Sequence, residues 1–368
     1  MVGATAWIYG EQVARRLRFT TAASLVAAVA LVVVAGYVFL RPRIPLPLLP
    51  GPRASVAERP SDAIIDPLNP GRPIARDWAP RATTGDWVRA RPGFQYSRSA
   101  AERGGVEPCA TRQIDTSAFE AWVPLVRGHF SAPRALRLDA EGRFDLVIHL
   151  NGDEPVRRRL IESGQPLVLY TLTIEPNKSY APLFSSPYLM DAIVMGIEKS
   201  ITERTGRAAR VGRIALSAWS AGFVGVAAAL GQPKISDARN IDTVILIDGL
   251  HAPRGDRNAF KPQLKPFVDY GARAAEGQRF MFVSHSSIDP PTFASTTECA
   301  HHLIASLDGK PEPVRRADAL GLELVEFYSK GDLHVRGYAG NDKADHCAQL
   351  ELLRDAFTAL GKRWSSGR

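Results

Sequence analysis

A serine in the middle of the chain lies in a pattern suited to nucleophilic chemistry. The strand-like run Ile214-Ala215-Leu216 leads to Ala218-Trp219-Ser220-Ala221-Gly222, and a small-residue stretch typical of a helix face follows. A serine on a tight strand-to-helix turn is lifted out of the sheet, so its hydroxyl points to open space. Ala218 and Gly222 are the small residues that such a turn requires on either side. An ordinary turn with a helix-capping serine is the alternative.

This pattern resembles the nucleophile elbow of the α/β-hydrolase family, whose common motif is G-x-S-x-G. Ala218 stands in place of the first glycine, which is a mild departure because the turn needs only a small side chain. The resemblance covers residues 132–364, roughly two thirds of the 368-residue chain. It implies a mostly parallel sheet with helices on both faces. It also implies that Ser220 attacks an ester or amide carbonyl and forms an acyl-enzyme.

A serine nucleophile needs a base, and the base needs an orienting acid. In the α/β-hydrolase order the acid follows the serine and the histidine comes last. The last histidine is His346, in Asp345-His346-Cys347 after the final predicted strand, and we favour it as the base. His334, in Asp332-Leu333-His334, is the alternative base. A polar residue at a helix start is the non-catalytic interpretation of His346.

Two aspartates are candidates for the acid. Asp248 directly follows the apolar run Thr243–Ile247, and the carboxyl end of a parallel strand faces the crevice where α/β proteins bind ligands. Asp289 follows the next predicted strand by several residues and is the alternative. We favour Asp248, although Asp248-Gly249 is also a common turn signal.

Acyl transfer also needs backbone N–H groups that stabilise the negative oxygen of the tetrahedral intermediate. The resemblance implies Ala221, directly after the serine, as one donor. His149-Leu150-Asn151-Gly152-Asp153 resembles the HG-type oxyanion motif of the family, extended by two residues. Gly152 is therefore the second candidate donor, and a plain Asn-Gly turn at the end of a strand is the alternative.

The remaining histidines and the cysteines give no metal-ligand spacing. His301 and His302 are adjacent on a predicted helix and point in different directions, so we do not expect them to share a metal. The sequence therefore predicts no metal site and no cofactor. Cys299 and Cys347 could form a disulfide in an exported domain, but two separate core residues are the favoured interpretation.

From Ala132 onwards the chain alternates between strand-like and helix-like segments. Apolar strands separated by helices predict a mostly parallel sheet covered on both faces. In the preceding extension, 81–131, the residues Phe119, Trp122, Leu125 and Val126 fit one helical face, so we expect this extension to pack on the main domain. The predicted strands are 134–138, 144–150, 166–174, 213–219, 243–247, 280–283 and 322–328, and the predicted helices are 186–203, 264–275, 295–307 and 345–360.

The N-terminal region predicts a membrane anchor. Residues Phe19–Leu40 carry no charge, and as a helix they would rise about 33 Å, enough to cross a hydrocarbon core of roughly 30 Å. The run is longer than the apolar region of a signal peptide, although a cleaved signal and a secreted protein remain the alternative. A short tail, 1–18, precedes the anchor. A proline-rich linker, 41–80, leads to an exported catalytic domain, 132–368.

The distribution of basic residues argues against nucleic-acid binding. The net charge is +8, but no dense basic block with interleaved aromatics occurs, so nucleic-acid binding has little support. The sequence predicts a membrane-anchored serine hydrolase with a small-molecule or acyl substrate, and it leaves the substrate and the oligomeric state open. A hydrolase-like binding scaffold without catalysis and an acyltransferase with the same three residues are the alternatives.

Overall fold

The computed structural model describes most of the chain after residue 113. The predicted tail 1–18 and anchor Phe19–Leu40 lie outside the described residues, as does most of 41–113. Within the described part, none of the helices combines the length and apolar content needed to cross a membrane. The described residues are 65–66, 69–73, 114–174, 179–232, 240–253, 257–290, 293–317, 323–339 and 343–366.

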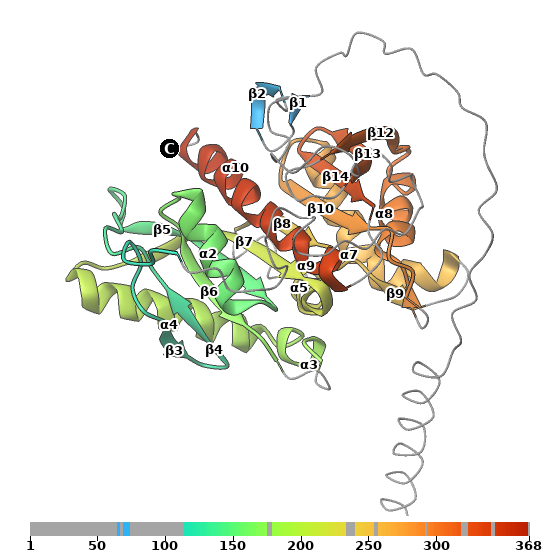
Figure 1. The fold of residues 1–368 in the computed structure, drawn as a ribbon. Helices are drawn as coiled ribbons and strands as arrows, with labels where there is room; N and C mark the ends of the chain where they lie inside the picture. The colour runs from blue at the N-terminus through green and yellow to red at the C-terminus, as the bar shows by residue number, and fades with distance from the viewer. Residues whose placement is uncertain are drawn as a thin grey trace, which may run out of the picture. The chain divides into compact units, whose positions relative to one another are not determined.

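A ten-stranded sheet forms the centre of the protein (Figure 1). Six adjacent strands, in the spatial order β6-β5-β7-β8-β10-β14, are parallel, and antiparallel strands extend the sheet at both edges. This confirms the predicted mostly parallel sheet. In spatial order the strands are β12 (Glu312–Ala317), β13 (Glu323–Lys330), β14 (Leu333–Tyr338), β10 (Phe280–Ser286), β8 (Ile241–Ile247), β7 (Arg210–Trp219), β5 (Arg143–Leu150), β6 (Val168–Leu172), β4 (Gly128–Ser131) and β3 (Val123–Leu125).

Helices cover both faces of the sheet, as predicted. One apolar core packs against α4, α5, α7 and α8, and a second packs against α2 and α10, which lie side by side in Figure 1. The central strands are buried on both faces, which explains their nearly continuous apolar sequences. The helices are α2 (Asp153–Ser163), α3 (Ala181–Phe184), α4 (Pro187–Thr205), α5 (Phe223–Leu230), α7 (Arg257–Ala275), α8 (Thr296–Ala305), α9 (Lys343–Ala348) and α10 (Leu352–Ser366).

Two small antiparallel pairs lie outside the main sheet. They are β1 (Ile65–Asp66) with β2 (Asn69–Pro73), and β9 (Ala252–Pro253) with β11 (Phe293–Ala294). The second pair connects the chain after Asp248 to the residues that precede α8. It therefore holds together two segments that meet at the candidate site.

Three sequence predictions were wrong in detail. The segment Phe119–Val126 is not a helix, because Pro124 lies within it and it supplies the edge strand β3, where a missing backbone N–H is tolerated. Residues 134–138 form a turn and coil in place of a strand, with Leu136 N–H donating to the Pro133 carbonyl oxygen. The single terminal helix is divided into α9, a 3₁₀ turn at Gln349–Glu351, and α10.

Candidate active site

The turn at Ser220 has the backbone strain expected of a nucleophile elbow. Ser220 follows β7, has a φ of 53°, and begins a 3₁₀ turn that leads into α5. A non-glycine residue with positive φ is uncommon, and such strain concentrates at functional sites. A Cβ at Gly222 would lie 2.1 Å from the Leu150 carbonyl oxygen, so the small residue after the serine is a steric requirement.

Asp248 and His346 form a close pair at the same edge of the sheet. His346 Nδ1 lies 2.7 Å from Asp248 Oδ2, although the two residues are 98 positions apart. Asp248 is 1% exposed, at the carboxyl end of β8, and its side chain also accepts a hydrogen bond from Thr296 Oγ1 at 2.8 Å. The His346 side chain is 20% exposed. A buried carboxylate thus holds a histidine that reaches solvent.

Hydrogen bonding keeps Asp248 ionised despite its burial. Burial by itself raises the pKa of this carboxyl, but hydrogen bonds from His346, Thr296 and Ser286 and the charge of His346 outweigh it and lower the pKa below its usual value. The charged acid orients the Nδ1–H of the imidazole and leaves Nε2 available as a base.

The serine turn contacts the segments that carry both members of this pair. Trp219 and Ile247 are register partners in β7 and β8, so Ser220 and Asp248 follow at the same level of the sheet. A Cβ on Gly249 would lie 2.9 Å from the Ser220 backbone nitrogen. The Trp219 ring stacks on His346 with centroids 4.7 Å apart, and its Nε1–H donates to the His346 carbonyl oxygen.

The alternative acid and base lie elsewhere. Asp289 is exposed and follows β10 by three residues, whereas the buried Asp248 contacts His346 directly. His334 is the second residue of β14, is level with Phe282, and hydrogen-bonds through Nδ1 to Ser329 Oγ at 3.0 Å. It therefore lies toward the amino end of its strand, away from the edge that carries Asp248.

The two candidate oxyanion donors differ in their present partners. Ala221 is exposed and directly follows Ser220. The N–H of Gly152 donates to Thr173 Oγ1 at 3.0 Å, and Asn151 and Gly152 have φ values of 75° and 122°. His149 supports this turn from below, because its Nε2 contacts the Asn151 carbonyl oxygen at 3.0 Å. The twisted turn was expected, but the Thr173 contact was not.

Sequence reasoning missed the residues that support the acid and the histidine. Thr296 and Trp219 act through tertiary contacts, and their positions in the sequence carry no sign of this role. Ser295 and Glu298 form a capping box, a motif that is visible in the sequence, and it fixes the start of α8, where Thr296 lies. That motif was the one available signal.

The two cysteines near the site are not bridged to each other. Cys299 is a free, buried thiol, and Cys347, next to His346, is disulfide-bonded. The two cysteines are therefore not bridged to each other, as favoured, but Cys347 is not the unbridged core residue that we expected. Cys299 packs with the α8 side of the core.

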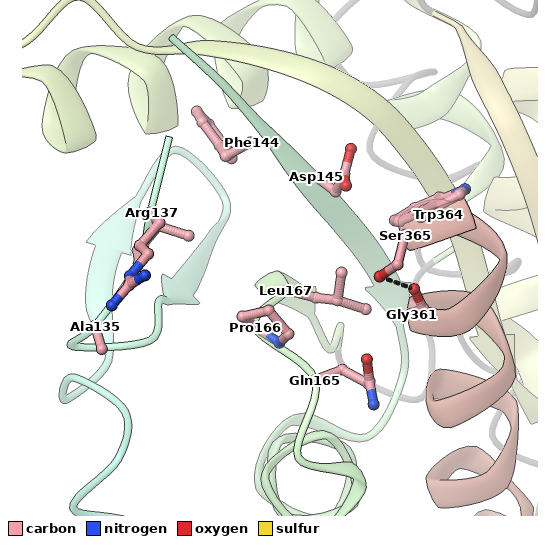
Figure 2. A pocket seen from close by; sticks show the side chains of 11 residues that line it. Ala135, Arg137, Phe144, Asp145, Gln165, Pro166, Leu167, Gly361, Trp364 and Ser365 are labelled. Atoms are coloured by element: carbon pink, nitrogen blue, oxygen red, sulfur yellow. Dashed lines mark hydrogen bonds between the residues drawn. The ribbon is translucent and has the colours of Figure 1, made fainter. Parts of the chain in front are cut away.

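A cavity of about 300 Å³ lies at the amino ends of the parallel strands, opposite the ends that carry Ser220 and Asp248 (Figure 2). It is lined by Phe144 and Asp145 at the start of β5, by Gln165 and Leu167 before β6, and by Trp364 near the end of α10. These are the amino ends of parallel strands, whereas Ser220 and Asp248 follow the carboxyl ends. The cavity is therefore not a pocket of the candidate active site.

Comparisons with known proteins gave structural similarities only. No family model matches the chain, and no curated protein matches its sequence. Among solved structures, a thermostable esterase is 17% identical with a TM-score of 0.35; the match covers 61% of this chain and only 56% of that one. A thermostable esterase from Pseudomonas putida ECU1011 is 12% identical with a TM-score of 0.38, over 76% of this chain and 90% of that one. The ester-hydrolase EH1AB1 from the Lake Arreo metagenome is 12% identical with a TM-score of 0.40, over 72% and 88%.

Proposed function

We propose that the protein is a serine hydrolase that cleaves a carboxylic ester or amide through an acyl-enzyme on Ser220. The observation that carries this proposal is the buried Asp248–His346 pair, with its 2.7 Å contact, beside a strained serine turn. The proposal is supported by the register of β7 and β8, because Ser220 and Asp248 directly follow the carboxyl ends of these neighbouring parallel strands, and by the contact of Asp248 with His346. The carboxyl edge of such a sheet is where α/β proteins bind their ligands.

The chemistry follows from this arrangement. Ser220 Oγ attacks the substrate carbonyl carbon while His346 Nε2 takes the hydroxyl proton, and Asp248 stabilises the imidazolium through Nδ1–H. The tetrahedral intermediate collapses, and His346 returns the proton to the departing alcohol or amine. Water then attacks the acyl-enzyme with His346 again as base, which releases the acid and regenerates Ser220.

The negative oxygen of the tetrahedral intermediate needs backbone N–H groups as hydrogen-bond donors. We assign one to the N–H of Ala221. The second is the N–H of Gly152, which would exchange Thr173 Oγ1 for the substrate oxygen. Removing one such donor typically lowers kcat by 10² to 10³, so this exchange matters to the rate.

The anchor predicted at Phe19–Leu40 would hold this activity at a membrane surface. We propose that the full chain is held in the membrane by this segment, with the hydrolase domain exported. Its support is the uncharged length of the segment. Full-length protein should stay with membranes after alkaline carbonate washing, and added protease should digest the domain in intact spheroplasts; release by carbonate would contradict the anchor.

A fluorophosphonate probe tests the catalytic proposal. The full-length protein in detergent should be labelled covalently, and Ser220→Ala should abolish both labelling and hydrolysis of a p-nitrophenyl ester. Ser306→Ala, at an exposed serine on α8's C-terminal side, is the matched control and should leave labelling unchanged. If folded wild-type protein is not labelled, or if Ser220→Ala is labelled as strongly, the proposal is wrong and a binding scaffold is favoured. Adding an alcohol acceptor and analysing the products separates hydrolysis from acyl transfer.

A further inference from the structure

Two histidines and a glutamate converge beside α8 in a second cluster. His285 is at the carboxyl end of β10, His301 is on α8, and Glu326 is on β13. Glu326 Oε1 lies 3.1 Å from His285 Nε2 and 2.6 Å from His301 Nε2, and the three ligand atoms all lie within 4.8 Å of one another. The adjacent residues His301 and His302 were not expected to share a metal, whereas the fold brings His301 to His285.

Gly337 explains how side chains from non-adjacent strands meet. His285 pairs with Gly337 on β14, and Gly337 pairs in turn with Glu326 on β13. Strands lie about 4.8 Å apart, so His285 and Glu326 are two strand spacings apart at the backbone. A Cβ at residue 337 would lie 2.4 Å from His285 Cε1 and 2.6 Å from Glu326 Cγ. The missing side chain is what lets the two side chains close over β14.

The hydrogen bonds around His285 fix its tautomer. Thr297 Oγ1 donates its one hydrogen to the Ser286 carbonyl oxygen at 2.7 Å, so it accepts from His285 Nδ1–H at 2.9 Å. In the neutral ring, Nε2 then carries a lone pair that faces the cluster. His285 is 2% exposed, and this Nε2 is buried without a hydrogen-bond partner among the described residues.

This leaves a lone pair facing a carboxylate oxygen at 3.1 Å, and two acceptors at that distance repel each other. A cation between them removes the repulsion and takes both as ligands. The Thr297 contact is the outer hydrogen bond that metal-binding histidines commonly have.

We propose that His285, His301 and Glu326 bind a zinc ion through Nε2, Nε2 and a carboxylate oxygen. Two imidazoles and one carboxylate are a known zinc donor set, and ligand distances of 2.0–2.2 Å in a tetrahedral site place ligand atoms roughly 3.3 Å apart. The separations of 2.6 and 3.1 Å would lengthen to this value, and the two histidine nitrogens, which lie within 4.8 Å of each other, would take up the same spacing. The His301 side chain is 43% exposed, which gives the ion a route in and leaves room for a water as fourth ligand.

The zinc site would fasten α8 to β10 and β13. The first turn of α8 holds Thr296, which donates to Asp248, and Thr297, which accepts from His285. The ion would therefore stabilise the helix that positions the candidate acid, without taking part in the reaction. This role does not depend on the proposed hydrolase activity.

Titration of the full-length protein with zinc tests this proposal. Protein expressed without a polyhistidine tag and treated with a chelator should bind one tight zinc equivalent by calorimetry at pH 7.5, with a raised Tm. Cobalt in its place should give the strong visible absorption of a tetrahedral site. Glu326→Gln and His301→Ala should each weaken zinc binding by at least tenfold.

His302→Ala is the matched control, because it removes the neighbouring histidine, about 100° further round the helix. It should leave zinc affinity unchanged. If wild-type protein binds no zinc at micromolar concentration, a proton holds the cluster together and the proposal is wrong. It is equally wrong if His302→Ala weakens binding as much as His301→Ala. His301 is partly exposed, so its variant should fold.

Discussion

Two histidine–carboxylate clusters contact helix α8. The acid is the most buried member of one cluster, and a histidine is the most buried member of the other. At the candidate active site the acid, Asp248, is 1% exposed and its histidine is 20% exposed. At the second cluster one histidine, His285, is 2% exposed, whereas its acid, Glu326, is 18% exposed and the other histidine, His301, is 43% exposed. Adjacent threonines serve the two sites, because Thr296 donates to Asp248 and Thr297 accepts from His285.

Burial has different consequences for the carboxylate and for the histidine of such a pair. A buried carboxylate with several donors stays charged and can orient a histidine whose other nitrogen reaches the substrate. A buried histidine whose proton is committed to a threonine presents a lone pair, and a neighbouring carboxylate makes that position attractive to a cation. Similar residues therefore favour acid–base chemistry in one place and metal binding in the other.

The largest expected effect comes from removing the carboxylate charge of one cluster at a time. Asp248→Asn should lower kcat for ester hydrolysis by about 10⁴-fold, because the amide neither holds the tautomer of His346 nor stabilises its imidazolium. Zinc affinity should be unchanged, which serves as the control for folding. Glu326→Gln should do the reverse, losing zinc but keeping fluorophosphonate labelling. Equal loss of both properties in either variant would contradict the independence of the two clusters.

A third histidine sharpens the comparison, because burial dominates its titration. His149 is fully buried against Ser217 Oγ and the Asn151 carbonyl oxygen. Burial lowers its pKa to about 4, although the Asn151 contact partly opposes this shift. In the unfolded chain its pKa is about 6.5, so only the unfolded state takes up the proton between these values.

The free energy of unfolding should therefore fall as the pH drops from 6.5 towards 4, by up to about 3 kcal/mol from this residue. Urea unfolding at pH 7.5 and pH 5 measures the loss. His149→Gln should lower stability at pH 7.5 and show a smaller further loss at pH 5. An unchanged pH dependence in the variant would show that other groups cause it.

The smallest effect is expected from the two threonines. Thr297→Val should weaken zinc binding by about 10 to 100-fold, because it removes the acceptor that fixes the tautomer of His285. Thr296→Val changes the neighbouring residue in the same way and should leave zinc affinity unchanged while lowering the ester hydrolysis rate. Calorimetry and a p-nitrophenyl ester assay on both variants measure the exchange. The interpretation fails if the two variants have the same profile.

The α/β architecture could be predicted because it depends on local pattern. Buried parallel strands need apolar side chains on both faces, so runs such as Thr243–Ile247 and Phe280–Val283 are visible without tertiary information. The capping box at Ser295 is visible for the same reason, since its donors and acceptors lie within three residues. Edge strands are harder, and β3 was mistaken for a helix because its few apolar residues also fit a helical spacing.

The serine turn could be predicted because a serine flanked by small residues at 218 and 222 is a local pattern, although the contact that requires a small residue at 222 comes from Leu150 on β5. The sequence by itself also supplied the candidate acids and bases, since the carboxyl end of each strand is marked by its first polar residue. Only the tertiary structure decided which of them meet. Asp248 and His346 are 98 positions apart, and their contact depends on strand order and on the placement of α9.

Tertiary contacts also explain why the histidine cluster could not be predicted from the sequence. Adjacent residues such as His301 and His302 are compared easily in a sequence, but helix geometry turns them apart. His285, His301 and Glu326 are brought together by a strand register that runs through Gly337. Gly337 matters because it has no side chain where His285 and Glu326 meet over β14. The sequence gives no local sign of this role, because the three strands become neighbours only in the folded sheet.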